Sequence, residues 1–340
     1  MARPLDRRTF LRVTTASLAF GALHRVGYAL GATGPGGELS GQLAMKNGER
    51  IAPFSFVQLS DTHVGFQGPP NPTGGTRAFE RAVEVVNALP QQPELVLFTG
   101  DLTHDTEEEG QRAARMKRFR DIASRLRVKE VHLIPGEHDA GFDGGVVFRD
   151  VFGETSYSFD HRGVHFVALD NVSRAKPEVG AERIAWLEKD LARFPATAPI
   201  VVFTHRPLFD LRPDWEWFTR DGDQVMRVLG RYENVTVLYG HIHREHVHEE
   251  PHSRHFAARS LMWAFPDPDS GAEKKPLPFD AANPFKNLGA RVVDVGGRGS
   301  PGAAPLALHE VELTLREHSG TEGFQQILRP SSLQPDGRLT

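Results

Sequence analysis

The sequence contains no cysteine among its 340 residues. This absence excludes disulfide bonds, and it also excludes metal sites built on thiolate ligands. Any metal that the chain binds must therefore be held by nitrogen and oxygen atoms, which histidine, aspartate and glutamate supply. The 16 histidines agree with such a site without establishing one.

The sequence also lacks an excess of positive charge and a long apolar run. Its formal net charge is −4, so we expect no nucleic-acid partner. The apolar, small-residue run from Val13 to Leu23 is too short to span a membrane, so we expect no stable membrane span in the mature chain. With 39% hydrophobic and 25% charged residues, the chain can bury a substantial core.

The first 31 residues have the pattern of an export signal. Arg7 and Arg8 are followed by Phe10, Leu11 and the apolar run, and this order resembles the twin-arginine signal of proteins that are exported already folded. We therefore expect a signal peptide over residues 1–31, the twin-arginine export machinery as a partner, and a periplasmic or secreted mature protein. The alternative is an amphipathic first helix of the folded domain.

The remaining chain predicts one large domain between two irregular segments. Residues 32–49 are Gly-rich and have no hydrophobic period, which indicates a linker. The domain is expected over residues 50–318, and residues 319–340 form a C-terminal tail.

Within the domain, short apolar runs alternate with segments of helical spacing. The predicted strands cover residues 56–59, 95–98, 131–134, 156–160, 164–169, 200–203, 235–238, 260–264, 290–295 and 306–315. The predicted helices cover residues 76–89, 107–126, 181–194 and 225–229. This alternation predicts an α/β fold with a parallel sheet covered by helices, and the hairpin at residues 156–169 adds an antiparallel part.

Five predicted strands end in acidic or histidine residues. These residues are Asp61, His63, Asp101, Glu137, His138, Asp139, His205, His241 and His243. Parallel strands point their carboxyl ends at the same edge of a sheet, so these side chains are expected to converge on one site. In an extended chain, Asp61 and His63 lie on the same side and can bind one cation. The same holds for His241 and His243, unless a turn directs each of them to a different ion.

The number of possible ligands favours two ions. Seven side chains supply possible nitrogen or oxygen ligands: Asp61, His63, Asp101, Glu137, His205, His241 and His243. Seven ligands are too many for one ordinary transition-metal ion, and they suffice for a pair of ions that leaves positions for water and substrate. Asp101 follows a glycine that lets the backbone come close, so its two carboxylate oxygens could bind two ions at once.

The five clusters resemble the calcineurin-like metallophosphoesterase superfamily. The motifs are Asp-x-His at residues 61–63, Gly-Asp at 100–101, Gly-x-His-Asp at 136–139, a strand-end histidine at 205 and Gly-His-x-His at 240–243. Residues 100–103 and 169–171 are most similar to the phosphodiesterase branch. The resemblance implies a four-layer α/β/β/α sandwich of two mixed β-sheets flanked by helices, and dinuclear-metal-dependent hydrolysis of a small phosphate-ester substrate.

The resemblance also implies a role for each residue. The first ion would be held by Asp61, His63 and His243, the second by His205 and His241, with Asp101 between them. The ions would be two divalent or mixed-valence ions of iron, manganese or zinc, and a hydroxide shared by them would attack phosphorus. His138 would be the general acid for the leaving group or a donor to a phosphoryl oxygen, oriented by Asp139.

Glu137 departs from the family pattern, which usually has Asn at this position. As a ligand of the second ion, an ionised glutamate brings a full negative charge and no hydrogen-bond donor. The added charge favours a more highly charged ion, and it opposes a dianionic phosphomonoester more than a monoanionic diester. We therefore expect diesters to be slightly favoured. The alternative is a catalytically weakened periplasmic protein that binds metal or phosphate on the same fold.

Residues after the fourth strand-end cluster offer further candidates. Arg206 is a possible substrate contact, although it can equally pair with an acidic side chain. Trp215, Trp217 and Phe218 lie in the following loop, where they either stack on a ring of the substrate or pack on the domain as a lid.

Overall fold

The computed structural model describes residues 53–72, 76–296 and 313, and the backbone of the strand residues 45–46, 49–50, 306–312 and 329–330. The predicted signal peptide over residues 1–31 lies outside the described residues, as do most of the predicted linker and of the C-terminal tail. In the part of the chain that is described, no helix has both the length and the apolar character needed to cross a membrane.

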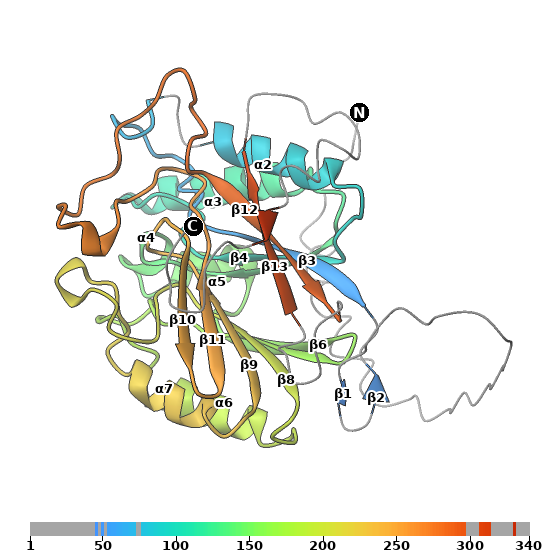
Figure 1. Cartoon of the computed structure of the whole chain (residues 1–340). Helices are drawn as coiled ribbons and strands as arrows, with labels where there is room; N and C mark the ends of the chain where they lie inside the picture. Colours follow the sequence, from blue (N-terminus) through green and yellow to red (C-terminus); the bar gives the residue numbers. More distant parts are fainter. Residues whose placement is uncertain are drawn as a thin grey trace, which may run out of the picture.

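Two six-stranded sheets form the centre of the domain (Figure 1). The strands of the first sheet are β3 (Phe54–Leu59), β4 (Leu95–Thr99), β5 (Glu130–Ile134), β12 (Gly289–Val295), β13 (Leu306–Glu312) and β14 (Arg329–Pro330). Those of the second are β6 (Tyr157–His161), β7 (Val164–Ala168), β8 (Pro199–Phe203), β9 (Asn234–Tyr239), β10 (His246–Glu250) and β11 (Ser253–Ala257). The strand orders are β14-β13-β12-β3-β4-β5 and β10-β11-β9-β8-β7-β6. A short hairpin of β1 (Met45–Lys46) and β2 (Glu49–Arg50) is separate.

Both sheets are mixed. In the first sheet β3, β4 and β5 are parallel, whereas β12 and β13 run antiparallel to their neighbours. In the second sheet β7, β8, β9 and β11 are parallel, and the edge strands β6 and β10 are antiparallel. The side chain of Gln58 in β3 donates to the carbonyl of Tyr239 in β9 at 3.1 Å. This contact joins the carboxyl ends of strands from the two sheets.

Helices cover the outer face of each sheet. The helices are α2 (Arg77–Ala88), α3 (Glu109–Ala123), α4 (Glu137–Ala140), α5 (Val146–Phe152), α6 (Ala181–Leu191) and α7 (Gly222–Leu229), with short 3-10 turns η2 (Pro213–Trp215) and η3 (Pro268–Ser270). One buried cluster joins α2, α3 and α5 to the first sheet, and another joins α6 and α7 to the second. A third cluster lies between the sheets.

Alternation along the strands produces these layers. In β3, Phe56 points into the core between the sheets, whereas its neighbour Val57 packs with the helices on the outer face. Successive side chains of a strand point to opposite faces, so a continuously apolar strand is buried on both sides. The resulting order is helix, sheet, sheet, helix, and the prediction of a four-layer α/β/β/α sandwich is confirmed.

The predicted strand over residues 260–264 is wrong. This segment is irregular, and the backbone N–H of Leu261 donates to the carbonyl of Ser60 at 3.1 Å, outside any strand ladder. Its apolar residues are buried because the segment crosses the carboxyl end of β3. The β10–β11 hairpin, in contrast, was not predicted as two strands, because the sequence of β10 is polar and half-exposed.

Candidate metal centre

The candidate ligands occupy unusual backbone conformations. Asp61, His63, Asp101, His241 and His243 all have positive φ angles, which lie between 41° and 66°. Residues other than glycine rarely adopt this region, and holding one there costs about 1–3 kcal/mol. These turns follow β3, β4 and β9, and they direct the side chains into the space between the strand ends. Such strain is typical of functional sites.

Two motif glycines allow the backbone to approach the ligands closely. A Cβ atom on Gly136 would lie 2.0 Å from Asp101 Oδ1, and a Cβ atom on Gly240 would lie 2.1 Å from Ser60 Oγ. Both distances are impossible for nonbonded atoms, so these positions require glycine. The loops that follow β5 and β9 are therefore packed directly against the acidic residues at the ends of β4 and β3.

The first candidate group contains Asp61, His63, Asp101 and His243. His63 Nε2 lies 3.1 Å from His243 Nε2 and 3.5 Å from Asp101 Oδ2. His243 Nε2 lies 3.3 Å from Asp61 Oδ1. Two atoms bound at about 2.1 Å to a common ion are about 3.0–3.4 Å apart. The spacing of these side chains fits an ion between them.

The second candidate group contains Glu137, His205 and His241. The two oxygens of Glu137 lie 2.7 Å from His205 Nε2 and 2.7 Å from His241 Nδ1. Asp101 Oδ2 is 3.5 Å from His205 Nε2, the same distance as from His63 Nε2 of the first group. Asp101 therefore lies between the groups, as expected for a bridging ligand.

Backbone carbonyls fix the orientation of three of these histidines. His205 Nδ1, His241 Nε2 and His243 Nδ1 lie 2.7, 3.1 and 2.9 Å from the carbonyl oxygens of Thr99, Glu216 and Trp263. A carbonyl only accepts, so each of these nitrogens carries the proton and the other nitrogen presents its lone pair to the centre. This arrangement is the usual support of a metal-binding histidine.

Four buried atoms in the centre form no well-aligned hydrogen bond among the described residues, although Glu137 lies 2.7 Å from the nitrogens of His205 and His241. The four atoms are Asp61 Oδ2, Glu137 Oε2, His205 Nε2 and His241 Nδ1. A buried polar atom without a well-formed hydrogen bond costs up to about 1–3 kcal/mol, so a cluster of such atoms in one place requires an explanation. Nitrogen and oxygen lone pairs that face one another are stabilised by a cation between them. The residues present therefore fit divalent metal ions.

The charge states of two of these histidines suit metal binding directly. Burial lowers the pKa of His63 well below its ordinary value, and burial lowers the pKa of His241 to about 4. Both rings are thus neutral near pH 7 and can act as ligands. Burial lowers the pKa of His205, but Asp101 and Glu137 outweigh it and raise this pKa well above its ordinary value, so an ion bound there would displace a proton. Burial raises the pKa of Glu137, but Arg206 and the two histidines outweigh it and hold this pKa well below its usual range.

His138 lies next to the two groups and is paired with Asp105. Its Nε2 is 4.0 Å from Asp101 Oδ2, and its Nδ1 is 2.7 Å from Asp105 Oδ1. Burial lowers the pKa of His138, but the carboxylates of Asp101, Asp105 and Glu137 outweigh it and raise this pKa to about 9. The ring is therefore protonated at neutral pH, so that Nδ1–H donates to Asp105 and Nε2–H points toward the centre.

Asp139 does not contact the His138 ring, in contrast to the sequence-based expectation. Its carboxylate accepts hydrogen bonds from the backbone N–H groups of Leu102, Thr103 and Gly136 and from the Thr103 hydroxyl, at 2.8–2.9 Å. Asp139 thus ties the loop after β5 to the loop after β4. The side chain that orients His138 is Asp105.

Sequence reasoning missed three further side chains around His63. The Trp263 ring is stacked on the His63 ring, with centroids 4.7 Å apart, and it lies 4.9 Å from the His243 ring. His104 Nδ1 is 3.3 Å from His63 Nδ1, and the Phe66 ring contacts both His104 and Trp263. His104 and Asp105 lie shortly after the Gly-Asp motif at residues 100–101 and could have been noticed there. Trp263 carried no signal, because it lies in an irregular segment.

The other candidates have mainly structural contacts. Trp215 and Trp217 are 6% and 0% exposed, so they pack inside the domain and cannot stack on a substrate. Arg206 is also buried, and its guanidinium lies 3.5 Å from Glu137 Oε1. Arg206 therefore lies at the candidate metal centre, and Glu137 is its acidic partner there.

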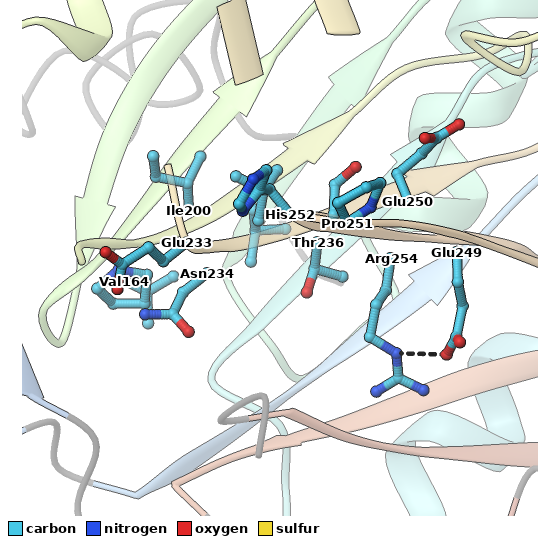
Figure 2. A pocket seen from close by; sticks show the side chains of 14 residues that line it. Val164, Ile200, Glu233, Asn234, Thr236, Glu249, Glu250, Pro251, His252 and Arg254 are labelled. Carbon is cyan, nitrogen blue, oxygen red and sulfur yellow. Dashed lines mark hydrogen bonds and ion pairs between the residues drawn. The ribbon is translucent and has the colours of Figure 1, made fainter. Parts of the chain in front are cut away.

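A separate pocket of about 260 Å³ lies at the opposite end of the second sheet (Figure 2). Its lining includes Pro199 and Asn234, which begin β8 and β9, whereas His205 and His241 follow these strands. The pocket is therefore remote from the candidate metal centre. The charged pair at its mouth, Arg254 and Glu249, is already joined at 3.1 Å.

Comparison with known proteins places this centre in a family. The sequence model of the calcineurin-like phosphoesterases matches residues 54–245, which include both candidate groups. The chain belongs to this family. Its relatives among the calcineurin-like phosphoesterases include a probable glycerophosphodiester phosphodiesterase of Arcobacter nitrofigilis, 31% identical over 202 residues, which cover 55% of this chain and 71% of the relative. A probable cyclic nucleotide phosphodiesterase of Rhodopseudomonas palustris is 30% identical over 215 residues, covering 56% and 72%.

More distant similarities include one further sequence relative and one solved structure with a similar fold. The serine/threonine-protein phosphatase CPPED1 of Danio rerio is 27% identical over 225 residues, covering 58% of this chain and 72% of the relative. The purple acid phosphatase PPD1 of yellow lupin has a similar fold, with a TM-score of 0.52 at 12% identity, covering 77% of this chain and 52% of that one. The prediction of a metal-dependent phosphoesterase of the calcineurin-like family is confirmed.

Proposed function

We propose that this chain hydrolyses phosphate esters with a pair of metal ions, with phosphodiesters slightly favoured over monoesters. The observation that carries the proposal is the pair of adjacent ligand groups, with Asp101 Oδ2 lying 3.5 Å from a histidine nitrogen of each. The proposed ligands are Asp61, His63 and His243 for one ion, Glu137, His205 and His241 for the other, and Asp101 for both. Their nitrogen and oxygen donors suit iron, manganese or zinc.

The chain's own residues would orient the substrate and supply a proton. Bound ions of this kind supply Lewis-acid activation of water and neutralise charge on the phosphoryl oxygens. His138 is protonated, faces the centre through Nε2 and is held by Asp105 at Nδ1, so it is placed to protonate the leaving oxygen or to donate to a phosphoryl oxygen. Positioned acids of this type contribute about 10²–10⁴-fold to the rate.

Two observations support the preference for diesters. The relatives at 30% identity and above are named as phosphodiesterases. Glu137 adds a negative charge where the family usually has a neutral amide, and this charge repels a dianion more than a monoanion. The preference remains slight, because the positive charge of Arg206, 3.5 Å from the Glu137 carboxylate, partly offsets this repulsion.

We also propose that the chain is exported by the twin-arginine pathway and acts in the periplasm or outside the cell. This proposal rests on the sequence of residues 1–31 alone, in which adjacent arginines precede an apolar run. Fractionation of cells that express the full chain, compared with an Arg7→Lys, Arg8→Lys variant, tests it. The wild type should be found outside the cytoplasm and the variant should remain inside. Equal distribution of the two would refute twin-arginine export.

Hydrolysis of a chromogenic phosphodiester and a chromogenic monoester tests the proposed reaction. The metal-loaded wild type should cleave both, with a modest advantage for the diester. His138→Ala should retain its metal content and lose turnover of esters with alkyl leaving groups. A wild type that binds two ions and cleaves neither ester, while Glu137→Asn gains activity, would instead support a catalytically weakened binding protein.

A further inference from the structure

Arg206 lies beside the residue in which this chain departs from its family. It follows the ligand His205 at the end of β8, and its side chain is 10% exposed. One guanidinium nitrogen, Nη2, is 3.5 Å from Glu137 Oε1, and the other, Nη1, donates to the carbonyl of Glu216 at 2.8 Å. Arg206 therefore has an acidic partner and a fixed orientation before any substrate arrives.

The carbonyl of Glu216 links Arg206 to a candidate ligand. The same oxygen accepts a hydrogen bond from His241 Nε2 at 3.1 Å. Glu216 has a φ of 60° and lies between the buried rings of Trp215 and Trp217. The loop is thus anchored on both sides of this carbonyl, and the guanidinium is held in a defined position relative to Glu137 and His241.

A charge in this position requires a counter-charge. Glu137 also lies 2.7 Å from nitrogens of His205 and His241, but arginine is the partner whose positive charge is permanent. A carboxylate in this position repels a substrate phosphate next to it. A family member with the usual Asn has no such charge. In this chain the negative charge of Glu137 is matched by the positive charge of Arg206, and the two groups lie 3.5 Å apart.

We propose that Arg206 is the counter-charge of Glu137, so that the pair as a whole adds no net charge beside the proposed second ion. This inference rests on the proposed phosphoesterase function. Arg206 then acts on ester selectivity through Glu137, as a positioning residue, and it is not a clamp that binds the phosphate directly. Without Arg206, the Glu137 carboxylate would lose its permanent side-chain counter-charge, so it would repel dianionic monoesters more strongly and strengthen the preference for diesters.

Lys274 provides a matched control. Its Nζ donates to the carbonyl of Trp215, one residue before the carbonyl that holds Arg206. Lys274 thus contributes one positive charge that interacts with Glu137 at longer range, but among the described residues no hydrogen bond or ion pair joins the two. Replacing either cation with Gln removes one charge, and only replacement of Arg206 removes the direct partner of Glu137.

The test is a double-mutant cycle on the full chain with Arg206→Gln, Glu137→Asn and their combination. The first measurement is the ratio of kcat/KM for a phosphodiester to that for a phosphomonoester, with manganese supplied. Arg206→Gln should raise this ratio about tenfold in the wild-type background, because contacting charged residues show strong coupling. In the Glu137→Asn background the same change should alter the ratio by less than about twofold, as for uncoupled sites.

The second measurement does not depend on activity. In the metal-stripped protein, Arg206→Gln should lower the thermal midpoint in the presence of Glu137 and leave it nearly unchanged in Glu137→Asn. If no ester is cleaved, the proposed function fails and this stability cycle still decides the pairing. Equal effects of Arg206→Gln in both backgrounds would show that Arg206 acts independently of Glu137. Equal coupling of Lys274→Gln would show a general field in place of a specific pair, and it would also overturn the proposal.

Discussion

Replacing Asp105 with Asn should reduce proton donation by His138. Asn preserves the shape of the side chain and can still accept a hydrogen bond from Nδ1, now 2.7 Å from Asp105 Oδ1, but it removes the charge. A hydrogen bond to a charged group contributes about 1.5–3 kcal/mol and a neutral one about 0.5–1.5 kcal/mol. Asp105 is 38% exposed, so we take a difference of about 1.4 kcal/mol, which corresponds to about tenfold in rate.

The assay is the dependence of turnover on the leaving group. A nitrophenolate departs without a proton, so Asp105→Asn should change its release little. An alkyl alcohol needs a proton from His138, and its release should slow by about tenfold. As the pH is raised above neutral, Asp105→Asn should lose activity at a lower pH than the wild type does. The reason is that Asp105 helps to raise the pKa of His138 to about 9.

Asp139→Asn is the contrasting variant. The Asp139 carboxylate accepts from three backbone N–H groups and a hydroxyl, and an amide would present an NH₂ group to some of these donors. Each buried donor left unpaired costs about 1–3 kcal/mol, so the thermal midpoint should fall. The dependence on the leaving group should stay as in the wild type. The reasoning is refuted if Asp139→Asn shows the selective loss for alkyl esters and Asp105→Asn does not.

Three further perturbations test other parts of the structure. In Gly136→Ala, the new Cβ atom would lie 2.0 Å from Asp101 Oδ1, and such overpacking costs about 1–3 kcal/mol. This variant should therefore bind less metal, measured by metal analysis, and have a lower thermal midpoint, measured by calorimetry. Trp263→Phe should abolish most of the quenching of tryptophan fluorescence by added manganese, because this ring is 4.7 Å from the His63 ring. His165→Gln should lower the free energy of unfolding in urea more at pH 6 than at pH 9. Burial lowers the pKa of His165, but hydrogen bonds to Asp160 and Asp190 outweigh burial and raise this pKa in the folded protein. The stabilisation by protonated His165 is therefore complete below the unfolded pKa of 6.5, and it is lost as the pH rises through the pKa of the folded state.

Each of these predictions has a clear contrary result. Normal metal content in Gly136→Ala would show that the loop can move away from Asp101. Quenching retained in Trp263→Phe, and lost in a Trp186→Phe control, would place the ion near a different ring. A destabilisation by His165→Gln that grows from pH 6 to pH 9 would contradict the charged pairing of this histidine.

Most of the fold could be predicted because its buried strands are predominantly apolar. β3, β4 and β8 are buried along their whole length, and such runs are recognisable without knowledge of their neighbours. β10 could not be recognised, because its sequence HVHEE is half-exposed and is held in place by pairing with β11. Residues 260–264 have a strand-like composition, but their burial arises from crossing the end of β3.

The ligand set could be predicted because its residues follow strand ends, whereas their supports could not. The carbonyls of Thr99, Glu216 and Trp263 that orient the histidines are backbone groups, and any residue type supplies one. The role assigned to Asp139 followed from its position next to His138 in sequence. In the structure both residues belong to the short helix α4, where adjacent side chains point in different directions. Asp105, from another loop, reaches the ring.

Metal content after reconstitution is the most direct test of a dinuclear centre. The wild-type chain, dialysed against manganese or zinc and analysed by elemental mass spectrometry, should retain two ions. Asp61→Asn and His205→Asn should each retain about one, because each removes a ligand of a different group. A wild type that retains one ion or none under these conditions, with both variants unchanged from it, would contradict the account.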